Sequence, residues 1–161
     1  MRRTDREVTE QKKINEIVSN CYCCRIGFCE EGEVYIVPLN FGYEEKEGKY
    51  TFYFHSAREG RKINMIRKQN SVGFEMDGNY QLKESETPCN YSAFYQSVIG
   101  TGKISFVNDT KAKKRALRLI MKHTTGKEDW DFSDEMLDCV CVFQLEVEKL
   151  SCKENRKQDS L

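Results

Sequence analysis

Six stretches of the sequence have the residue types and alternation of β-strands, and this pattern constrains the fold more than any other feature. They span residues 21–29, 33–43, 50–55, 70–77, 91–107 and 139–150. In the first stretch Tyr22, Cys24, Ile26 and Phe28 fall on one face, as the two-residue period of a strand requires. Only short turns separate the first three stretches, which favours antiparallel pairing over a doubly wound parallel sheet. The sequence therefore predicts an α+β domain built on six antiparallel strands.

Proline and glycine mark special positions in two of these strands. Pro38 lies within 33–43 and predicts a sheet edge or a local break, because proline has no N–H to donate to a ladder. Gly100 and Gly102 lie within 91–107, where they predict a bend or bulge. Since a sheet must bend to close on itself, these glycines favour a barrel.

Three further segments have the period of a helix. They are residues 4–20, 60–69 and 110–123. The third is the clearest, because Ala116, Ile120 and their neighbours form an apolar stripe opposite a face of lysines and arginines. Residues 78–90 and 124–138 are polar and are expected to be loops. We expect a single domain over residues 1–152, followed by a disordered tail at 153–161.

The charge balance and hydropathy argue against several classes of function. The 161 residues include 26 basic and 26 acidic side chains, whereas a dedicated nucleic-acid binder needs a surplus of positive charge. No stretch approaches the roughly 18 apolar residues of a membrane span. The segment from Met1 to Gln11 has no apolar signal core. We therefore expect a cytoplasmic protein that binds neither nucleic acid nor membrane.

Eight cysteines raise the question of a metal site. Cys21 and Cys24 have the spacing of a zinc knuckle, and Cys139 with Cys141 would supply a second pair. Both pairs fall on predicted strands, where Cys21 and Cys24 would point to opposite faces. We therefore expect buried, reduced thiols and no metal site.

The segment from Phe54 to Lys62 runs from the end of a strand into the start of a helix. A helix start offers free backbone N–H groups and positive potential. Ser56, Arg61 and Lys62 add a hydroxyl and two cations at that point, which suits a phosphate monoester. The alternative is ordinary helix capping with solvated charges.

The segment from Val37 to Tyr43 is the second candidate binding element. An edge strand leaves backbone N–H and C=O groups that can read the polar edge of a flat heterocycle, and Phe41 or Tyr43 could stack on its face. The alternative is an edge strand that its proline merely protects.

These two segments and two later ones carry a family resemblance. Tyr-Ile-Val-Pro-Leu-Asn-Phe-Gly-Tyr at 35–43, followed by Tyr-Phe-His-Ser-Ala…Gly-Arg-Lys at 53–62, resembles a flavin-binding core. Residues 95–102 (YQSVIGTG) and 112–121 resemble a later strand and helix of the same proteins. Over roughly residues 5–150 the chain is similar to the pyridoxamine 5'-phosphate oxidase-like FMN-binding split barrels, in particular their nitroimidazole-resistance (Nim-type) branch. The resemblance implies a Greek-key split barrel that acts as a homodimer, with FMN sites at the interface.

The same resemblance implies a role for individual residues. It places Arg61 and Lys62 on the flavin phosphate, and His55 and Ser56 near the ring and ribityl chain. The other implied cofactor-binding residues are Pro38, Leu39, Asn40 and Phe41 around the ring, Gln96, Ser97 and Val98 on the adjoining strand, and Trp130 from the partner subunit. His55 is the candidate catalytic residue, because imidazole titrates near neutral pH; the alternative is a histidine that donates to a backbone carbonyl. His123, at the end of a basic helix, is expected to interact with the helix dipole.

The resulting hypothesis is an FMN-dependent oxidoreductase. NADH or NADPH would reduce the flavin, which would pass electrons to a small acceptor, with a nitroaromatic such as a 5-nitroimidazole as the candidate. The alternatives are a flavin- or haem-binding homodimer without turnover, and a regulatory ligand-binding dimer without a cofactor. The sequence does not decide between these classes, because fold analogy alone does not fix function.

Overall fold

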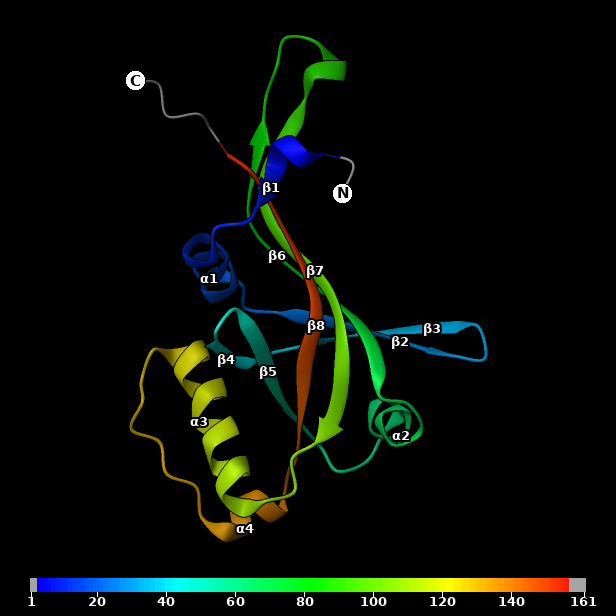
Figure 1. The fold of residues 1–161 in the computed structure, drawn as a ribbon, viewed down its shortest axis with the longest axis vertical. Helices are drawn as coiled ribbons and strands as arrows, with labels where there is room; N and C mark the ends of the chain where they lie inside the picture. The colour runs from blue at the N-terminus through cyan, green and yellow to red at the C-terminus, as the bar shows by residue number, and fades with distance from the viewer. Residues whose placement is uncertain (1–2, 157–161) are drawn as a thin grey trace.

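The computed structural model describes residues 3–156, which form one antiparallel sheet with helices around it (Figure 1). The strands are β1 (Glu7–Val8), β2 (Cys24–Glu30), β3 (Glu33–Leu39), β4 (Gly42–Lys46), β5 (Lys49–Ser56), β6 (Ser71–Lys83), β7 (Ser92–Phe106) and β8 (Cys141–Asn155). The α-helices are α1 (Gln11–Asn20), α2 (Arg61–Lys68), α3 (Thr110–Thr125) and α4 (Asp134–Asp138), with 3₁₀ turns η1 (Thr4–Arg6) and η2 (Pro88–Asn90). The strand order is β3-β2-β6-β7-β8-β5-β4, and β1 pairs with β8.

Residues 3–156 contain eight strands, not the six that the sequence predicts. One reason is that the predicted strand 33–43 is two strands, β3 and β4, which lie at opposite ends of the strand order. Asn40 and Phe41 carry the chain between those edges. Gly42 then passes so close to α3 that a Cβ atom would lie 2.3 Å from the backbone carbonyl carbon of Leu119. Pro38 lies on β3, which among the described strands pairs with β2 alone, so its predicted edge position is confirmed.

The other additional strand lies near the N-terminus, where the predicted helix 4–20 is wrong in its first half. Residues 4–6 form η1, and Glu7 and Val8 form β1 opposite Lys153 and Cys152 of β8. The helix begins only at Gln11. Pairing with β8 overrides the apolar period that had placed Val8 in the helix.

Two segments predicted as loop or tail belong to long strands. β6 continues to Lys83 with a bulge between Gly78 and Gln81, so the predicted loop 78–90 is largely a hairpin with β7. β8 continues to Asn155, which pairs with Tyr95. Residues 153–155 are therefore strand, and the remaining predicted tail at 157–161 lies outside the described residues. In both places backbone pairing with β7 overrides polar composition.

Elsewhere the predicted helices are confirmed at α2 and α3. The predicted loop 124–138 contains α4, which Ser133 caps by accepting a hydrogen bond from the backbone N–H of Met136. In Figure 1 α3 and α4 lie on one side of the sheet and α2 on the other. No helix within residues 3–156 is long and apolar enough to cross a membrane.

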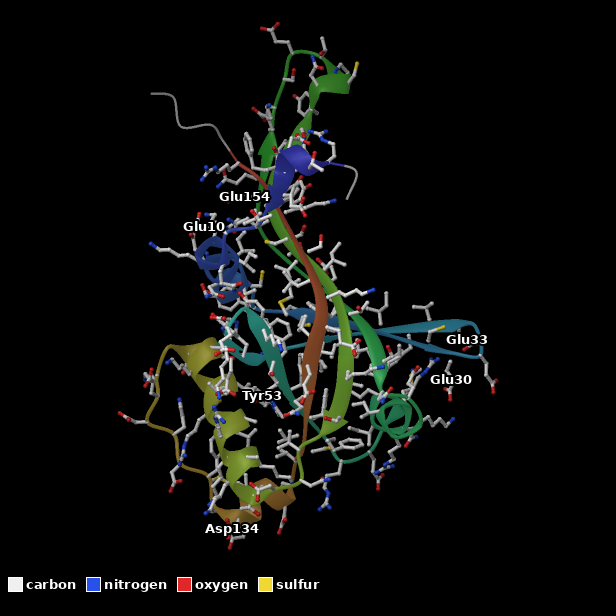
Figure 2. The ribbon with its side chains drawn as sticks, in the orientation of Figure 1. Glu10, Glu30, Glu33, Tyr53, Asp134 and Glu154 are labelled. Carbon is white, nitrogen blue, oxygen red and sulfur yellow. The ribbon has the colours of Figure 1, made fainter. Side chains whose placement is uncertain are left out.

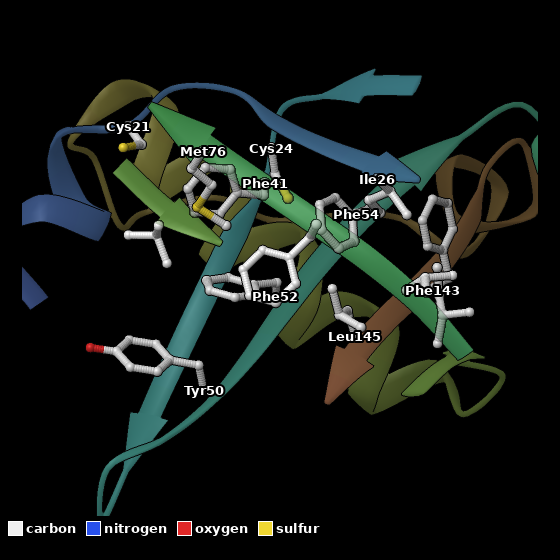
Figure 3. Packing of buried hydrophobic residues seen from close by; sticks show 14 of the residues in the cluster. Cys21, Cys24, Ile26, Phe41, Tyr50, Phe52, Phe54, Met76, Phe143 and Leu145 are labelled. Atoms are coloured by element: carbon white, nitrogen blue, oxygen red, sulfur yellow. The ribbon is translucent and has the colours of Figure 1, made fainter. Parts of the chain in front are cut away.

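The hydrophobic core fills the inside of the curved sheet, and a second cluster lies beneath α3. Figure 3 shows Phe41, Phe52 and Phe54 at the centre of the core. Phe52 meets Phe41 and Phe74 edge to face, with ring centroids 5.6 and 5.3 Å apart. The second cluster joins Ala116, Leu117, Ile120, Val107, Leu137 and Val142. Because β5 alternates, its phenylalanines face the core while Tyr53 packs against the second cluster.

Candidate functional site

The turn between β5 and α2 has the backbone geometry of an anion site. Gly60 precedes the helix with a φ of 125°, and nothing lies within 4 Å of where its Cβ would be. No side chain within residues 3–156 caps the start of α2. The first backbone N–H groups of the helix therefore lack the side-chain acceptor that usually satisfies them. These N–H groups can donate hydrogen bonds to an anion there.

Two predicted phosphate ligands frame this turn. The Arg61 guanidinium lies 4.6 Å from the centre of the Tyr35 ring and 3.5 Å from the Glu33 carboxylate, so α2 meets the first half of β3. Figure 2 shows Glu33 at the end of the β2–β3 hairpin. Lys62 is partly buried and forms no ion pair within residues 3–156. Ser56 donates a hydrogen bond from its Oγ to the carbonyl of Ala57 at 2.8 Å. The structure thus places Ser56, Arg61 and Lys62 on one turn.

His55 lies at the end of β5, opposite Val142 of β8. It shares the face of β5 that turns away from the core, and its side chain has no hydrogen-bond partner among the described residues. Burial lowers the pKa of His55 below its ordinary value. The imidazole is therefore predominantly neutral near pH 7, with both ring nitrogens available to a ligand.

His123 has a different role from the one predicted. Its Nε2 lies 2.7 Å from the carbonyl oxygen of Cys21, and its ring centre lies 4.4 Å from that of Phe41. Burial also lowers the pKa of His123, so the neutral form is favoured. His123 therefore ties α3 to the end of α1 and is not a charged partner of the helix dipole.

The four residues expected around a flavin ring are placed unequally. Phe41 has no exposed surface and packs into the core, so its ring offers no face to a ligand. Leu39 is partly buried against the same core, whereas Pro38 and Asn40 are exposed. Pro38 lies three residues beyond Tyr35, about 10 Å along an extended strand and on the opposite face. Because they are exposed, Pro38 and Asn40 are more accessible to a ligand than Leu39 or Phe41.

The three candidate residues on β7 also differ. Val98 is completely buried. Gln96 is buried, where its Nε2 donates to Glu154 at 2.6 Å and its Oε1 accepts from Asn79 at 2.5 Å. Ser97 is only partly buried. Figure 1 places the β6–β7 hairpin, which Gln96 supports, at the opposite end of the molecule from α2. One chain therefore does not bring Gln96 to the β5–α2 turn.

Trp130 lies between α3 and α4, and among the described residues its hydrogen bonds are to Lys127, Glu128 and Arg118. Its Nε1 donates to the carbonyl of Lys127 at 3.0 Å, and its own carbonyl accepts from Arg118 at 2.8 Å. Figure 1 places this connection on the side of the sheet away from α2. Its predicted contact with a flavin requires a second subunit and stays a prediction.

The eight cysteines are free thiols, but the expectation that they are buried is wrong for Cys29, Cys89 and Cys139, which are exposed. Burial raises the pKa of Cys21 to about 12 and that of Cys152 to about 11, and it raises the pKa of Cys24 further. These three thiols are therefore unreactive at neutral pH. Within residues 3–156 no group of three His, Cys, Asp or Glu side chains is placed to hold a metal ion.

An uncovered face of the sheet is the feature that sequence reasoning missed. Val34 and Ile36 of β3 are 68% and 60% exposed, and Ile99 of β7 is 52% exposed. Between them lies an open cavity of about 350 Å³ over the glycine pair Gly27 and Gly73. Glycines within strand-like stretches can mark such an open face, and Gly27 and Gly73 were visible in the sequence. Their position side by side could not be predicted, because it depends on how β2 and β6 pair.

The fold and the β5–α2 turn together define the class of flavin-binding split barrels. Comparison with known proteins agrees with this class. A solved protein from Bacteroides thetaiotaomicron, whose proposed role is 5-nitroimidazole antibiotic resistance, is 32% identical over 91% of this chain and 85% of that chain, with a TM-score of 0.78. The flavocytochrome Anf3 from Azotobacter vinelandii is 18% identical over 99% of this chain and 75% of its own, with a TM-score of 0.79. An FAD and haem binding protein from Mycobacterium smegmatis is 12% identical over 96% of this chain and 77% of its own, with a TM-score of 0.80.

The family follows from a more specific match. The sequence profile described as pyridoxamine 5'-phosphate oxidase matches residues 10–154. No curated protein matches the chain. The chain belongs to the pyridoxamine 5'-phosphate oxidase family, and the two more distant structures support the fold alone.

Proposed function

We propose that this chain binds FMN through its phosphate at the β5–α2 turn and acts as a flavin-dependent oxidoreductase. The observation that carries the proposal is the uncapped start of α2 behind Gly60, flanked by Arg61 and Lys62. A phosphate would accept hydrogen bonds from the helix N–H groups and charge-assisted bonds from the two cations. Among ligands that carry a phosphate, a flavin is the one that membership of this family supports.

Each residue of the turn has a distinct task in this proposal. Ser56 can redirect its hydroxyl from Ala57 to the phosphate or ribityl chain. Tyr35 holds the Arg61 guanidinium in place, which reduces the side-chain entropy lost on binding. Flavin supplies hydride and electron transfer, and the protein supplies position and electrostatics. Pro38 and Asn40 are the exposed candidates to support the ring.

His55 is the proposed proton donor to the reduced acceptor. Because burial lowers its pKa, the protonated ring is a stronger acid than a free histidine, although less of it is present at neutral pH. NADH or NADPH is the proposed electron donor. A nitroaromatic is the proposed acceptor, on the support of the proposed role of the 32% identical Bacteroides protein.

A homodimer is part of the proposal. The uncovered face carries Val34, Ile36 and Ile99, and Arg25 bridges Glu75 and Asp77 at its rim, with distances of 2.9 and 2.5 Å. An apolar centre with a charged rim is the usual composition of a protein interface. Trp130 and Gln96 would need such a second subunit to approach a flavin, because one chain does not bring them to the β5–α2 turn.

A flavin- or haem-binding homodimer without turnover is the second candidate. His55 favours it, because its unpaired neutral imidazole is the form that binds haem iron. The named contents of the Anf3 and Mycobacterium structures are consistent with this alternative.

The deciding experiment identifies the chromophore and then asks for turnover. Mass spectrometry and absorbance of untagged purified protein should show a bound flavin, and NADH or NADPH should be consumed faster when a 5-nitroimidazole is added. A haem absorbance band would favour the second candidate. A colourless protein that fails to bind added FMN would refute flavin binding altogether.

A further inference from the structure

An open cavity of about 270 Å³ lies where α2, the start of α3 and the ends of β7 and β8 meet. Figure 1 shows α2 and α3 on either side of the end of β7. Two arginines line the cavity, Arg58 just before α2 and Arg67 on α2. Asn108 and Lys113 line it from the start of α3. We call this hollow the Arg67–Lys113 cavity, and no acidic side chain of the described residues lines it.

The three cations of the cavity have no ion-pair partner within residues 3–156. Arg58 donates to the backbone carbonyl of Asp138 at 2.9 Å, and Arg67 to the side chain of Asn64 at 3.3 Å. Other cations of α2 and α3 are paired with carboxylates, namely Arg61, Lys68, Lys114, Arg115, Arg118 and Lys122. The cavity therefore gathers positive charge that no described carboxylate neutralises, and an oxyanion would pair with it.

Cys141 indicates that the three cations act on one point. Its partly buried thiol lines the cavity. Burial raises the pKa of Cys141, and three positive charges oppose that rise, those of Lys113, Arg67 and Arg58. Since all three are close enough to influence one thiol, a single oxyanion in the cavity would interact with them together.

The cavity adjoins the end of β5, where the proposed proton donor lies. In the ladder between β5 and β8, Ser56 is paired with Cys141 and His55 with Val142. Both residues of β8 line the cavity. The Cβ atoms of residues directly opposite one another in an antiparallel pair lie about 5 Å apart. A small molecule whose anionic end occupies the cavity would therefore bring its other end beside His55.

The size of the cavity and the rest of its wall suit a small ligand. Its volume of about 270 Å³ is below the range of about 300–1,000 Å³ that is usual for pockets of drug-sized ligands. Phe106 and Val140 are partly exposed and give the wall an apolar part. A short aliphatic or one-ring anion therefore fits the cavity better than a nucleotide.

We propose that the Arg67–Lys113 cavity binds an oxyanionic group of the electron acceptor, so that this chain prefers small acceptors that carry a carboxylate or a phosphate over neutral ones. The inference rests on the proposed function, because it assumes that the acceptor is reduced beside His55. The two arginines and Lys113 would hold the oxyanion, and the side-chain amide of Asn108 would add a further donor.

Steady-state reduction of matched nitroaromatics by the flavin-loaded full-length chain tests the proposal. The anionic acceptors are para-nitrobenzoate and para-nitrophenyl phosphate, and para-nitrobenzamide is the neutral analogue of the first. Each kcat/KM is divided by the rate constant for reduction of the same compound by free reduced FMN, which corrects for intrinsic reactivity. The corrected value for para-nitrobenzoate should exceed that for the amide at least about tenfold, as expected for one charge-assisted hydrogen bond. The phosphate compound shows which oxyanion the cavity prefers.

Substitutions in the cavity should remove this preference. Arg67→Ala and Lys113→Ala should each lower the ratio of the corrected values for para-nitrobenzoate and para-nitrobenzamide. The double variant should bring the ratio close to one. Lys111→Ala is the matched control, because it removes an exposed lysine from the same helix outside the cavity.

Alkylation of Cys141 gives a second readout that needs neither flavin nor turnover. Iodoacetate is anionic and iodoacetamide is neutral. The cations should therefore raise the ratio of their alkylation rates at Cys141 above the ratio at exposed Cys89. Peptide mass spectrometry measures both ratios. The double variant should lower the ratio at Cys141, and para-nitrobenzoate should protect Cys141 more than para-nitrobenzamide does.

Equal corrected kcat/KM values for para-nitrobenzoate and para-nitrobenzamide, or a preference that survives the double substitution, would overturn this inference and leave the proposed function intact. A chain that reduces none of these nitroaromatics would instead overturn the proposed reaction. In that case a raised iodoacetate ratio at Cys141 would still support an anion site in the cavity, and equal ratios at Cys141 and Cys89 would refute it.

Discussion

The substitution Arg61→Ala should weaken the binding of a flavin phosphate much more than it lowers the stability of the fold. The contacts of Arg61 in the structure set the expected size of both effects. The Arg61 side chain is 54% exposed, and its partner Glu33 is 81% exposed at 3.5 Å, so that ion pair contributes little. The contact with the Tyr35 ring is worth about 0.5–1 kcal/mol at an exposed site. The free energy of unfolding should therefore fall by only about 1 kcal/mol.

The effect on FMN binding should be larger. A hydrogen bond to a charged group contributes about 1.5–3 kcal/mol, so losing one with the phosphate should weaken FMN binding roughly 10- to 150-fold. Riboflavin, which has the same ring but no phosphate, is the control ligand. Its Kd should change less than about threefold.

Isothermal titration of the flavin-free protein with both ligands measures these effects, with urea denaturation to confirm folding. Arg67→Ala provides the matched arginine control, since Arg67 lies on the same helix but does not face Tyr35. Equal losses for FMN and riboflavin would mean that Arg61 does not contact the phosphate. Unchanged FMN binding would refute the phosphate site at this turn.

Three further predictions concern the core, the titration of the histidines and the proposed chemistry. Gly42→Ala should lower the free energy of unfolding by about 3 kcal/mol or more, because the new Cβ would lie 2.3 Å from the Leu119 backbone. Gly27→Ala is the control and should lower it by less than about 1 kcal/mol, because the nearest atom would lie 3.8 Å from the new Cβ. Equal urea midpoints for the two variants would contradict this packing. Burial lowers the pKa of His123 and His55 below 6.5, so the unfolded chain binds more protons as pH falls through about 6.5, and the free energy of unfolding should decrease there. His123→Gln should flatten that decrease in urea titrations, and stability that rises on acidification would contradict the assignment. His55→Ala should lower nitroaromatic reduction by roughly 10²-fold with FMN still bound, and full activity would remove His55 from the mechanism.

The sequence alone determined most of the local structure. The alternation of β2 from Cys24 onward and of β5, the apolar stripe of α3 and the edge position of Pro38 follow from rules that act over a few residues, and the structure confirms them. Tyr22, which the same pattern placed on the face of Cys24, instead lies before β2 and is 71% exposed. The same holds for the β5–α2 turn, because Ser56, Arg61 and Lys62 are close in sequence and one helix start gathers them. The residues that carried the family resemblance lay largely in these local elements.

Only the tertiary structure decided the features that depend on pairing between distant segments. Pairing with β7 makes the polar residues 78–83 and 153–155 part of strands. The chain crossing from β3 to β4 buries Phe41, whose ring the sequence had predicted to stack on a ligand. Gln96 proved to be satisfied by Asn79 and Glu154, residues 17 and 58 positions away. The open cavity that Arg67, Lys113 and Cys141 line likewise needs α2, α3 and β8 to meet. Local periodicity reports which face of an element is apolar, but it does not report which element will cover that face, because that choice belongs to the whole packed chain.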